Sequence, residues 1–280
     1  ERYGSNFCKK STELKYHEKL IIEEVEIFLA PAGHVLGSAQ VVMNFANQVI
    51  TVSGDYKRQD DPTCAAFEPI KSDIFITEAT FALPVFKHPN ANTQINLLIK
   101  SIQNFPERCH VIGVYSLGKA QRLIKMLRNN GWHNTIYLHG SLVKICNLYE
   151  KFGIDLGDLE PATIQDKPEK PHDFYKGKLI LAPPSALADR WSRRFPDPIL
   201  GMASGWMTVK QRAKQRGINL PLILSDHADW NEILTTIKEV SPKEVWITHG
   251  AEEALIYECS KNNLTAKALS IIGYESDTDL

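Results

Sequence analysis

Histidine and carboxylate residues follow several apolar, strand-like segments of the chain, each beside a small residue. They are His34 in "FLAPAGH", Asp55 in "ITVSGD", Glu78 in "IFITEA", His227 in "LILSDHAD" and His249 in "VWITHG". In open α/β folds, ligand-binding and catalytic groups gather at the carboxyl ends of strands. Imidazole nitrogens and carboxylate oxygens, without thiolates, suit Zn²⁺ or another borderline divalent ion. Together the five segments predict a site of metal or acid–base chemistry.

Each of these residues also has a structural interpretation when it is taken alone. His34 lies in "PAGHVLGSAQ", where the surrounding glycines predict a turn after a strand, in which the histidine has no role of its own. Asp55 can cap a turn, Glu78 can pair with a lysine, and His227 can be a hydrogen-bonded core histidine. Five such coincidences in one chain are less expected than one site, and the metal or acid–base interpretation is therefore favoured.

The elements that must position these residues change in character along the chain. The first 83 residues predict mainly strands, because β-branched apolar segments are broken by Gly, Asn or Asp. From residue 84 to about residue 222, strands alternate with helices, which predicts a largely parallel sheet. Apolar residues at helical spacing predict helices within residues 88–105, between residues 118 and 131, over residues 141–152 and over residues 230–240.

The bulk composition describes an ordinary globular protein. The chain has 280 residues, is 43% hydrophobic and carries a formal net charge of −1. No stretch approaches the ~18 apolar residues that a membrane span requires, so we expect no membrane association. The five cysteines are odd in number and never form C-x-x-C, which disfavours a disulfide framework or a thiolate zinc site. A reducing cytoplasm is the expected compartment.

Charge is unevenly distributed. Residues 176–216 contain nine Lys or Arg and two Asp, whereas residues 217–280 contain eleven Asp or Glu and four Lys. The basic segment is either a surface that binds a polyanion or an ordinary solvated face.

Several segments, in the same order along residues 31–250, resemble one known family. They include "AGHVLGSA", "SGDY", "LGKAQ", "SDHADW" and "VWITHG". The family is the β-CASP branch of the metallo-β-lactamase superfamily, whose members are nucleases that process RNA or DNA ends. Within that branch, "GDYKRQDDPTCAAFEP", "RWSRRFPDP" and "SGWM" resemble the bacterial ligase-associated DNA exonucleases.

The resemblance implies an α/β fold in three parts. Residues 1–83 would form the first part of a metallo-β-lactamase αββα sandwich, and residues 223–280 its C-terminal part. Residues 84–222 would form an inserted α/β β-CASP domain of mainly parallel sheet, which binds nucleic acid and closes over the active site.

The resemblance also implies a role for each strand-end residue. His34 matches a ligand of a first zinc, Asp55 the aspartate that bridges two zincs, and His249 a ligand of the second. Glu78 and His227 match a catalytic pair, in which the histidine protonates the leaving oxygen and the carboxylate holds its charged form. Two Zn²⁺ ions, or Mn²⁺ as an alternative, would be the cofactors, and Asp55 would serve in both binding and catalysis.

One motif of the superfamily is missing from the sequence. H-x-H-x-D-H should precede His34, but residues 1–33 contain only His17. Because the chain begins with Glu1, truncation is our interpretation, and a true loss of the motif is the alternative. With three of about seven metal ligands, we expect this chain alone to bind metal weakly and to lack turnover.

Six residues of the middle segment are candidates for binding nucleic acid. Helix N-termini favour phosphate, arginine suits backbone phosphates, and an indole can stack on an unpaired base. The candidates are Ser116, Lys119, Arg190, Trp191, Arg193 and Arg194. Core packing is the alternative interpretation of Trp191.

The favoured function is a zinc-dependent DNA exonuclease that works in DNA end repair with an ATP-dependent DNA ligase. One alternative is an RNA-processing β-CASP ribonuclease, because the active-site motifs do not distinguish the two sugars. A second is a catalytically silent nucleic-acid-binding scaffold of the same fold, against which the retained Asp55, Glu78, His227 and His249 argue. A small-molecule hydrolase is disfavoured by the basic insertion.

Overall fold

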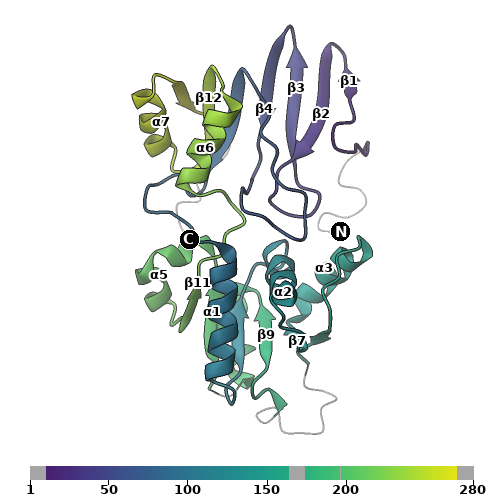
Figure 1. Cartoon of the computed structure of the whole chain (residues 1–280), viewed down its shortest axis with the longest axis vertical. Coiled ribbons are helices and arrows are strands. Elements are labelled where there is room, and N and C mark those ends of the chain that lie inside the picture. Colours follow the sequence, from purple (N-terminus) through teal and green to yellow (C-terminus); the bar gives the residue numbers. More distant parts are fainter. Residues whose placement is uncertain (1–10, 164–173, 196, 270–280) are drawn as a thin grey trace.

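The computed structural model describes residues 11–163, 174–195 and 197–269, and these form two lobes stacked along the long axis (Figure 1). The first lobe is built on a seven-stranded sheet in the order β1-β2-β3-β4-β5-β12-β13. Its strands are β1 (Leu20–Ile22), β2 (Val25–Pro31), β3 (Ala39–Phe45), β4 (Gln48–Val52), β5 (Ile74–Ala79), β12 (Glu244–Gly250) and β13 (Thr265–Ala268).

In this sheet, β1 to β4 form an antiparallel meander, and β4, β5, β12 and β13 are parallel to one another. Helices α6 (Trp230–Val240) and α7 (Glu252–Lys261) connect and cover the parallel part. Their apolar sides pack on the strands in one buried cluster, which includes Phe75, Ile233 and Val245. The described residues thus supply one sheet of the αββα sandwich that the sequence implies, with helices packed against it.

The second lobe is built on a parallel six-stranded sheet in the order β11-β10-β6-β9-β7-β8. Its strands are β6 (His110–Gly113), β7 (Ile136–Leu138), β8 (Leu159–Pro161), β9 (Leu179–Ala182), β10 (Ile199–Ala203) and β11 (Leu220–Leu222). Its helices are α1 (Ala91–Asn104), α2 (Lys119–Asn129), α3 (Gly140–Lys151), α5 (Lys210–Gln215) and the 3₁₀ turns η1 (Pro184–Leu187), η2 (Ser192–Arg194) and η3 (Gly205–Thr208). The mixed α/β class with a parallel sheet confirms the fold predicted from the sequence.

Helices α1 and α2 follow the predicted spacing closely. In α2, the apolar side chains of Ala120, Leu123 and Leu127 are fully buried, as their recurrence every three or four residues requires. The helix ends before Gly131, whose φ of +81° is the left-handed conformation that glycine adopts without strain. One feature of α2 was not predicted from the spacing: Arg122 is also fully buried.

The two lobes meet where the loop after β6 reaches the turn after β2. A Cβ on Gly118, whose φ is +80°, would lie 2.3 Å from Cγ1 of Val35, so only glycine permits this approach. The hydroxyl of Tyr149 accepts a hydrogen bond of 3.2 Å from the backbone N–H of Leu36. The start of α2 is therefore held directly beside the segment that carries His34.

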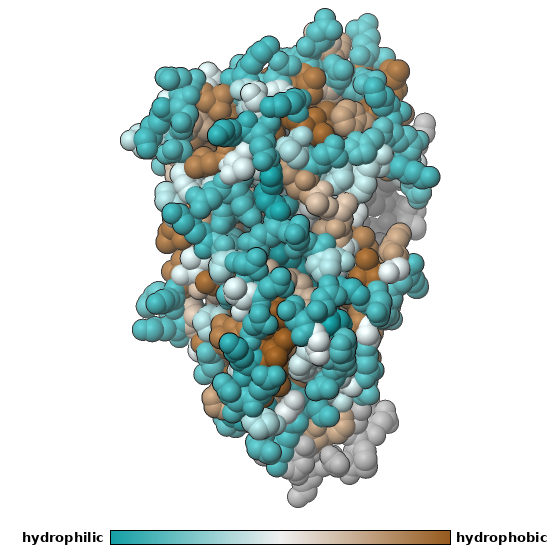
Figure 2. Space-filling model, in the orientation of Figure 1, coloured by the Kyte–Doolittle hydropathy of each residue, from teal (hydrophilic) through white to brown (hydrophobic). Residues whose placement is uncertain are grey.

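No helix among the described residues has the length and apolarity to cross a membrane. Among the same residues, Cys64, Cys109, Cys146 and Cys259 form no disulfide with one another. Figure 2 shows that one face of the molecule is mostly hydrophilic, with apolar side chains in small separate patches.

Candidate active site

The turn that carries His34 is built by glycine and serine. Gly33 has a φ of +71°, and a Cβ there would lie 2.5 Å from the carbonyl oxygen of Lys57. The hydroxyl of Ser38 accepts hydrogen bonds of 3.1 Å from the backbone N–H groups of His34 and Val35. The small residues of "PAGHVLGSAQ" thus form the predicted turn, and they also fix the direction of the His34 side chain.

His34, Asp55 and His227 come together at one point although they are far apart in the sequence. One donor atom of each lies within 4.8 Å of the others. The Nε2 atom of His34 is 3.8 Å from a carboxylate oxygen of Asp55, and the rings of His34 and His227 have centroids 4.8 Å apart. This is the one group of three or more potential metal donors in the described parts of the chain.

Glu78 lies directly behind His227. Its carboxylate, only 2% exposed, accepts a hydrogen bond of 2.8 Å from Nδ1 of His227. It also accepts bonds of 2.8 Å from the backbone N–H of Tyr56 and 2.5 Å from the hydroxyl of Thr80. Because Nδ1 is used by Glu78, the Nε2 atom of His227 is the one left to face His34 and Asp55.

The pair of Glu78 and His227 is electrostatically matched. Burial alone would raise the pKa of Glu78, but the hydrogen bond and charge of His227 outweigh it and lower that pKa. Burial alone would lower the pKa of His227, but the hydrogen bond and charge of Glu78 outweigh it and raise that pKa. Both groups therefore favour their charged forms, as a proton-holding pair requires.

His249 lies outside the group of three donors. It sits in β12 at a break in the strand pairing, since Thr248 is opposite Glu78 and Gly250 is opposite Ala79. Its φ of +58° is unusual for a residue other than glycine, and its side chain is exposed. Such bulges re-aim side chains and are common beside active sites. His249 is thus next to Glu78 in the sheet, with its role as a ligand still a prediction.

The first two nucleic-acid candidates lie at the start of α2, beside this group. Ser116 is partly buried in the turn, which Gln121 fixes by bonds to Gly118 N and the Ser116 carbonyl. The sequence suggests that Lys119 is a phosphate ligand at the surface, but in the structure this side chain is buried. Its side chain is only 3% exposed, because its ammonium group pairs with Asp226 at 3.3 Å.

The other four candidates belong to a separate segment around η2. Arg190 and Arg193 are exposed. Trp191 is partly buried and packs against Phe195 and His139, with the guanidinium of Arg194 4.8 Å from its ring centroid. Trp191 thus takes part in core packing, as its alternative interpretation has it.

The sequence interpretation missed a set of buried charges behind the site. They are Lys57, Asp61, Arg122 and Asp226, joined by Lys119. A signal was available in "GKAQRLIKML", because Lys119 and Arg122 fall among the apolar positions of the helix. Charged residues on a buried helix face need partners, and the partners are on the loops that carry the site.

The donor set fits a divalent cation of the zinc type. An imidazole, from His34, and a carboxylate, from Asp55, are ligands that such ions take, and a structural zinc site requires four. These two donors are therefore part of a coordination sphere with room for further ligands. The electrostatic pair of Glu78 and His227 stands at its edge, so the arrangement suits hydrolysis with proton transfer.

Comparison with known proteins gives three findings. The family model described as "Zn-dependent metallo-hydrolase RNA specificity domain" matches residues 221–260, which contain His227, α6 and His249. A "Probable DNA ligase" of Opitutus terrae is 26% identical over 87% of this chain and 23% of its own length. "Cleavage and polyadenylation specificity factor 73" of Drosophila melanogaster is 33% identical over 49% of this chain and 21% of its own length.

A solved structure shares the fold. The crystal structure of a protein of unknown function from Enterococcus faecalis aligns with a TM-score of 0.62 at 13% identity. The alignment covers 96% of this chain and 68% of the other. This chain spans less than a quarter of the length of the two curated relatives above. The described fold and the matched segments agree with the resemblance of the sequence to the metallo-β-lactamase superfamily and its β-CASP branch.

Proposed function

We propose that this chain belongs to a DNA exonuclease that trims DNA ends for a DNA ligase. The observation that carries the hydrolytic part is the convergence of His34, Asp55 and His227, with Glu78 behind the last of these. The similarity to a "Probable DNA ligase" over most of the chain supports the link to ligation.

In this proposal His34 and Asp55 would hold one divalent cation, and Asp55 and His249 would help to hold a second. We propose zinc as the ion and manganese as its substitute. Bound there, such ions would activate a water molecule and stabilise charge on the scissile phosphate. Asp55 is exposed to the extent of 45% of its side chain, so its carboxylate is open to a ligand and to solvent.

The proton step belongs to His227. Its Nδ1 donates to Glu78, which holds the imidazole in its charged form and fixes its orientation. The Nε2–H group is then free to protonate the oxygen that leaves the phosphate. Glu78, which is buried and has three donors around it, keeps its own charge throughout.

The second lobe, which we assign to an inserted domain over residues 84–222, supplies the nucleic-acid surface. Ser116 at the start of α2 is beside the donor group, where backbone N–H groups favour a phosphate. Arg190 and Arg193 extend the surface with exposed guanidinium groups that suit phosphates farther along the strand. Lys119 is left out of this surface because Asp226 occupies its ammonium group.

An RNA substrate is the second candidate, and one specific observation favours it. The matched family model is described by RNA specificity, and it covers the segment that carries His227 and His249. Hydrolysis of a phosphodiester does not require the 2′-hydroxyl, so the site chemistry serves both substrates. DNA is preferred here because the ligase-named relative aligns with most of the chain, whereas the family model covers 40 residues, 221–260.

The test uses the complete gene product with Zn²⁺ or Mn²⁺ and end-labelled single-stranded DNA and RNA of the same sequence. Progressive shortening of the DNA, faster than that of the RNA, is the expected result. His227→Ala should abolish it, and Arg193→Ala should slow it mainly at low substrate concentration. Equal or faster degradation of RNA would overturn the DNA assignment, and no metal-dependent cleavage of either would overturn the nuclease proposal.

A further inference from the structure

A buried network of charges joins the two lobes behind the donor group. Lys57 and Asp61 come from the loop after β4, Lys119 and Arg122 from α2, and Asp226 from the loop before α6. Their side chains are between 0% and 5% exposed. Lys57 pairs with Asp61 at 2.6 Å, and Lys119 pairs with Asp226 at 3.3 Å.

Arg122 is the member that contacts both loops of the first lobe. Its NH1 group donates to the carbonyl of Ser225 at 2.6 Å, and its NH2 group donates to the carbonyl of Asp60 at 3.3 Å. Its guanidinium also lies 3.7 Å from Asp61 and 3.9 Å from Asp226. A planar guanidinium fixes the directions of its donors, so one side chain sets the separation of the two loops.

These two loops carry two residues of the candidate site. Asp55 precedes Asp60 in the loop after β4, and His227 follows Ser225 in the loop before α6. Contacts of its side chain and of its backbone attach His34 to the same two loops. Its Nδ1 atom is 2.8 Å from the carbonyl of Asp226, and its own carbonyl accepts a 3.1 Å bond from the ammonium group of Lys57.

The contact with the Asp226 carbonyl fixes the chemistry of His34. A carbonyl oxygen only accepts hydrogen bonds, so the proton of a neutral His34 must be on Nδ1. The lone pair is then on Nε2, the atom that faces Asp55 at 3.8 Å. Any shift of the segment that contains Ser225 and Asp226 releases this tautomer and moves His227 with it.

We propose that Arg122 is a positioning residue of the candidate site, by which the second lobe sets the tautomer of His34 and the spacing of His34, Asp55 and His227. Arg122 does not contact these three side chains; it acts through the carbonyls of Ser225 and Asp60. The inference rests on the proposed function only in taking His34 and Asp55 as ligands of a metal centre.

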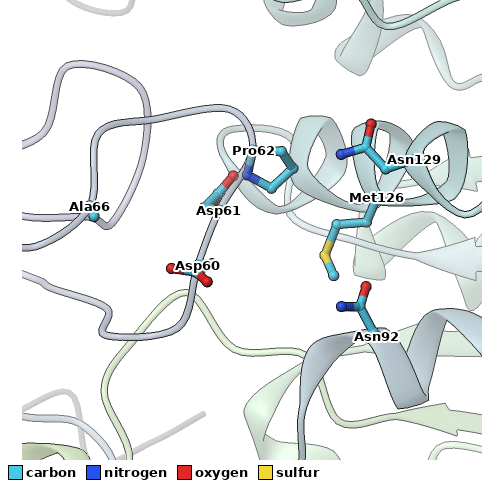
Figure 3. Close-up of a pocket in the computed structure, with 7 residues that line it drawn as sticks. All are labelled: Asp60, Asp61, Pro62, Ala66, Asn92, Met126 and Asn129. Carbon is cyan, nitrogen blue, oxygen red and sulfur yellow. The ribbon is translucent and has the colours of Figure 1, made fainter.

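A pocket of about 390 Å³ lies between the loop after β4 and helices α1 and α2. In Figure 3, Asp60, Asp61 and Pro62 lie across from Met126, one turn beyond Arg122 on α2. The side chains of His34, Asp55 and His227 do not line it. The pocket is therefore separate from the donor group, and Arg122 does not line it either.

The same helix supplies a matched control. Arg128 is also buried and also donates only to carbonyls, at Leu156, Trp132, Asn134 and Asp158. All four carbonyls belong to the second lobe. Arg128→Met therefore removes the same kind of buried guanidinium from α2 without touching the loops of the site.

The test compares wild type, Arg122→Met, Arg122→Lys and Arg128→Met in the 280-residue chain. The first readout is the tautomer of His34 in the metal-free chain at neutral to alkaline pH, from the ring nitrogen shifts of ¹⁵N-histidine, assigned with His34→Gln. The second readout is the affinity for Co²⁺ or Zn²⁺ by competition with a chelator. Circular dichroism verifies that each variant is folded.

We expect a single Nδ1–H tautomer in wild type and in Arg128→Met. Arg122→Met should give a mixture of tautomers and at least tenfold weaker metal binding. Arg122→Lys keeps the charge but reaches one carbonyl, so its tautomer mixture and metal affinity should lie between those of wild type and Arg122→Met. It serves as the main variant if Arg122→Met does not fold. A folded Arg122 variant with the wild-type tautomer and affinity would overturn the inference.

The two readouts separate this inference from the proposed function. If the 280-residue wild type binds neither metal, its own donors do not suffice to hold the ion, while the tautomer comparison still decides the role of Arg122. If wild type binds metal and Arg128→Met weakens the binding as much as Arg122→Met does, the effect is general loss of stability and the inference fails.

Discussion

At the scale of single residues, the pair of Glu78 and His227 should control how stability depends on pH. The lowered pKa of Glu78 means that its carboxylate stabilises the fold above its ordinary value of 4.5, and this stability is lost as the pH falls through the folded pKa. The raised pKa of His227 means that its charged form stabilises the fold below 6.5, and this stability is lost as the pH rises through the folded pKa.

Between pH 6.5, the ordinary value of His227, and an alkaline pH above its raised pKa, the metal-free chain should therefore lose stability from this pair. Glu78→Gln should remove that fall, and at pH 6.5 it should lower the free energy of unfolding by about 1–3 kcal/mol, because a buried charged hydrogen bond is lost. Urea unfolding at the two pH values measures both effects.

Glu244→Gln is the control for this experiment. Glu244 is an exposed carboxylate of β12 whose pKa is lowered by the indole N–H of Trp246. It titrates entirely below pH 6.5, so its variant should keep the wild-type change between the two pH values. If Glu78→Gln loses as much stability between the two pH values as wild type does, the pair does not hold the proton as described.

At the scale of elements, α6 has two glutamates with opposite effects. Burial raises the pKa of Glu232 to about 7, although its side chain caps the backbone N–H of Asp229. The stability that Glu232 contributes is therefore lost as the pH rises from 4.5 to about 7. Glu232→Gln keeps an oxygen for the cap, so it should raise the melting temperature at pH 8, above the pKa of about 7, and change it little at pH 4.5.

Glu239 on the same helix should respond in the other direction. Its hydrogen bond and charge pairing with Arg58, at 2.5 Å, lower its pKa. Glu239→Gln should therefore lower the melting temperature at pH 8, where the partner Glu232 variant raises it. Equal shifts of the same sign in both variants would contradict the assigned environments of α6.

The elements themselves were largely predictable from local spacing. The helix over residues 230–240 and the turn glycine Gly131 agree with the structure, because each depends on neighbours within a few residues. The convergence of His34 and Asp55 was predictable only as a set of strand ends. The burial of Arg122 has a local signal in its place among apolar helix positions, but its partners do not, because they are about 60 and 100 residues away in the sequence.

At the scale of the whole molecule, the contact between lobes should couple stability to the site. Gly118→Ala places a Cβ 2.3 Å from Val35 at a φ of +80°, which forces α2 away from the turn of His34. Gly131 has nearly the same φ, +81°, but no atom lies within 4 Å of the position that an added Cβ would take. Gly131→Ala should therefore cost about 1–2 kcal/mol of stability from backbone strain alone.

Gly118→Ala should cost more than Gly131→Ala, and it should also weaken the binding of Co²⁺, which Gly131→Ala should leave unchanged. Chemical unfolding and metal competition measure the two effects in the same samples. If both variants lose the same stability and keep the same metal affinity, the lobes are not coupled through this contact.

The most direct test of the account is the position of a bound metal. A crystal of the complete gene product grown with Zn²⁺, measured on both sides of the zinc absorption edge, should show an anomalous peak about 2.0–2.2 Å from His34 Nε2 and a carboxylate oxygen of Asp55. Asp55→Asn should remove or greatly weaken that peak. Zinc bound elsewhere, with His34 and Asp55 free of it, would contradict the metal centre described here.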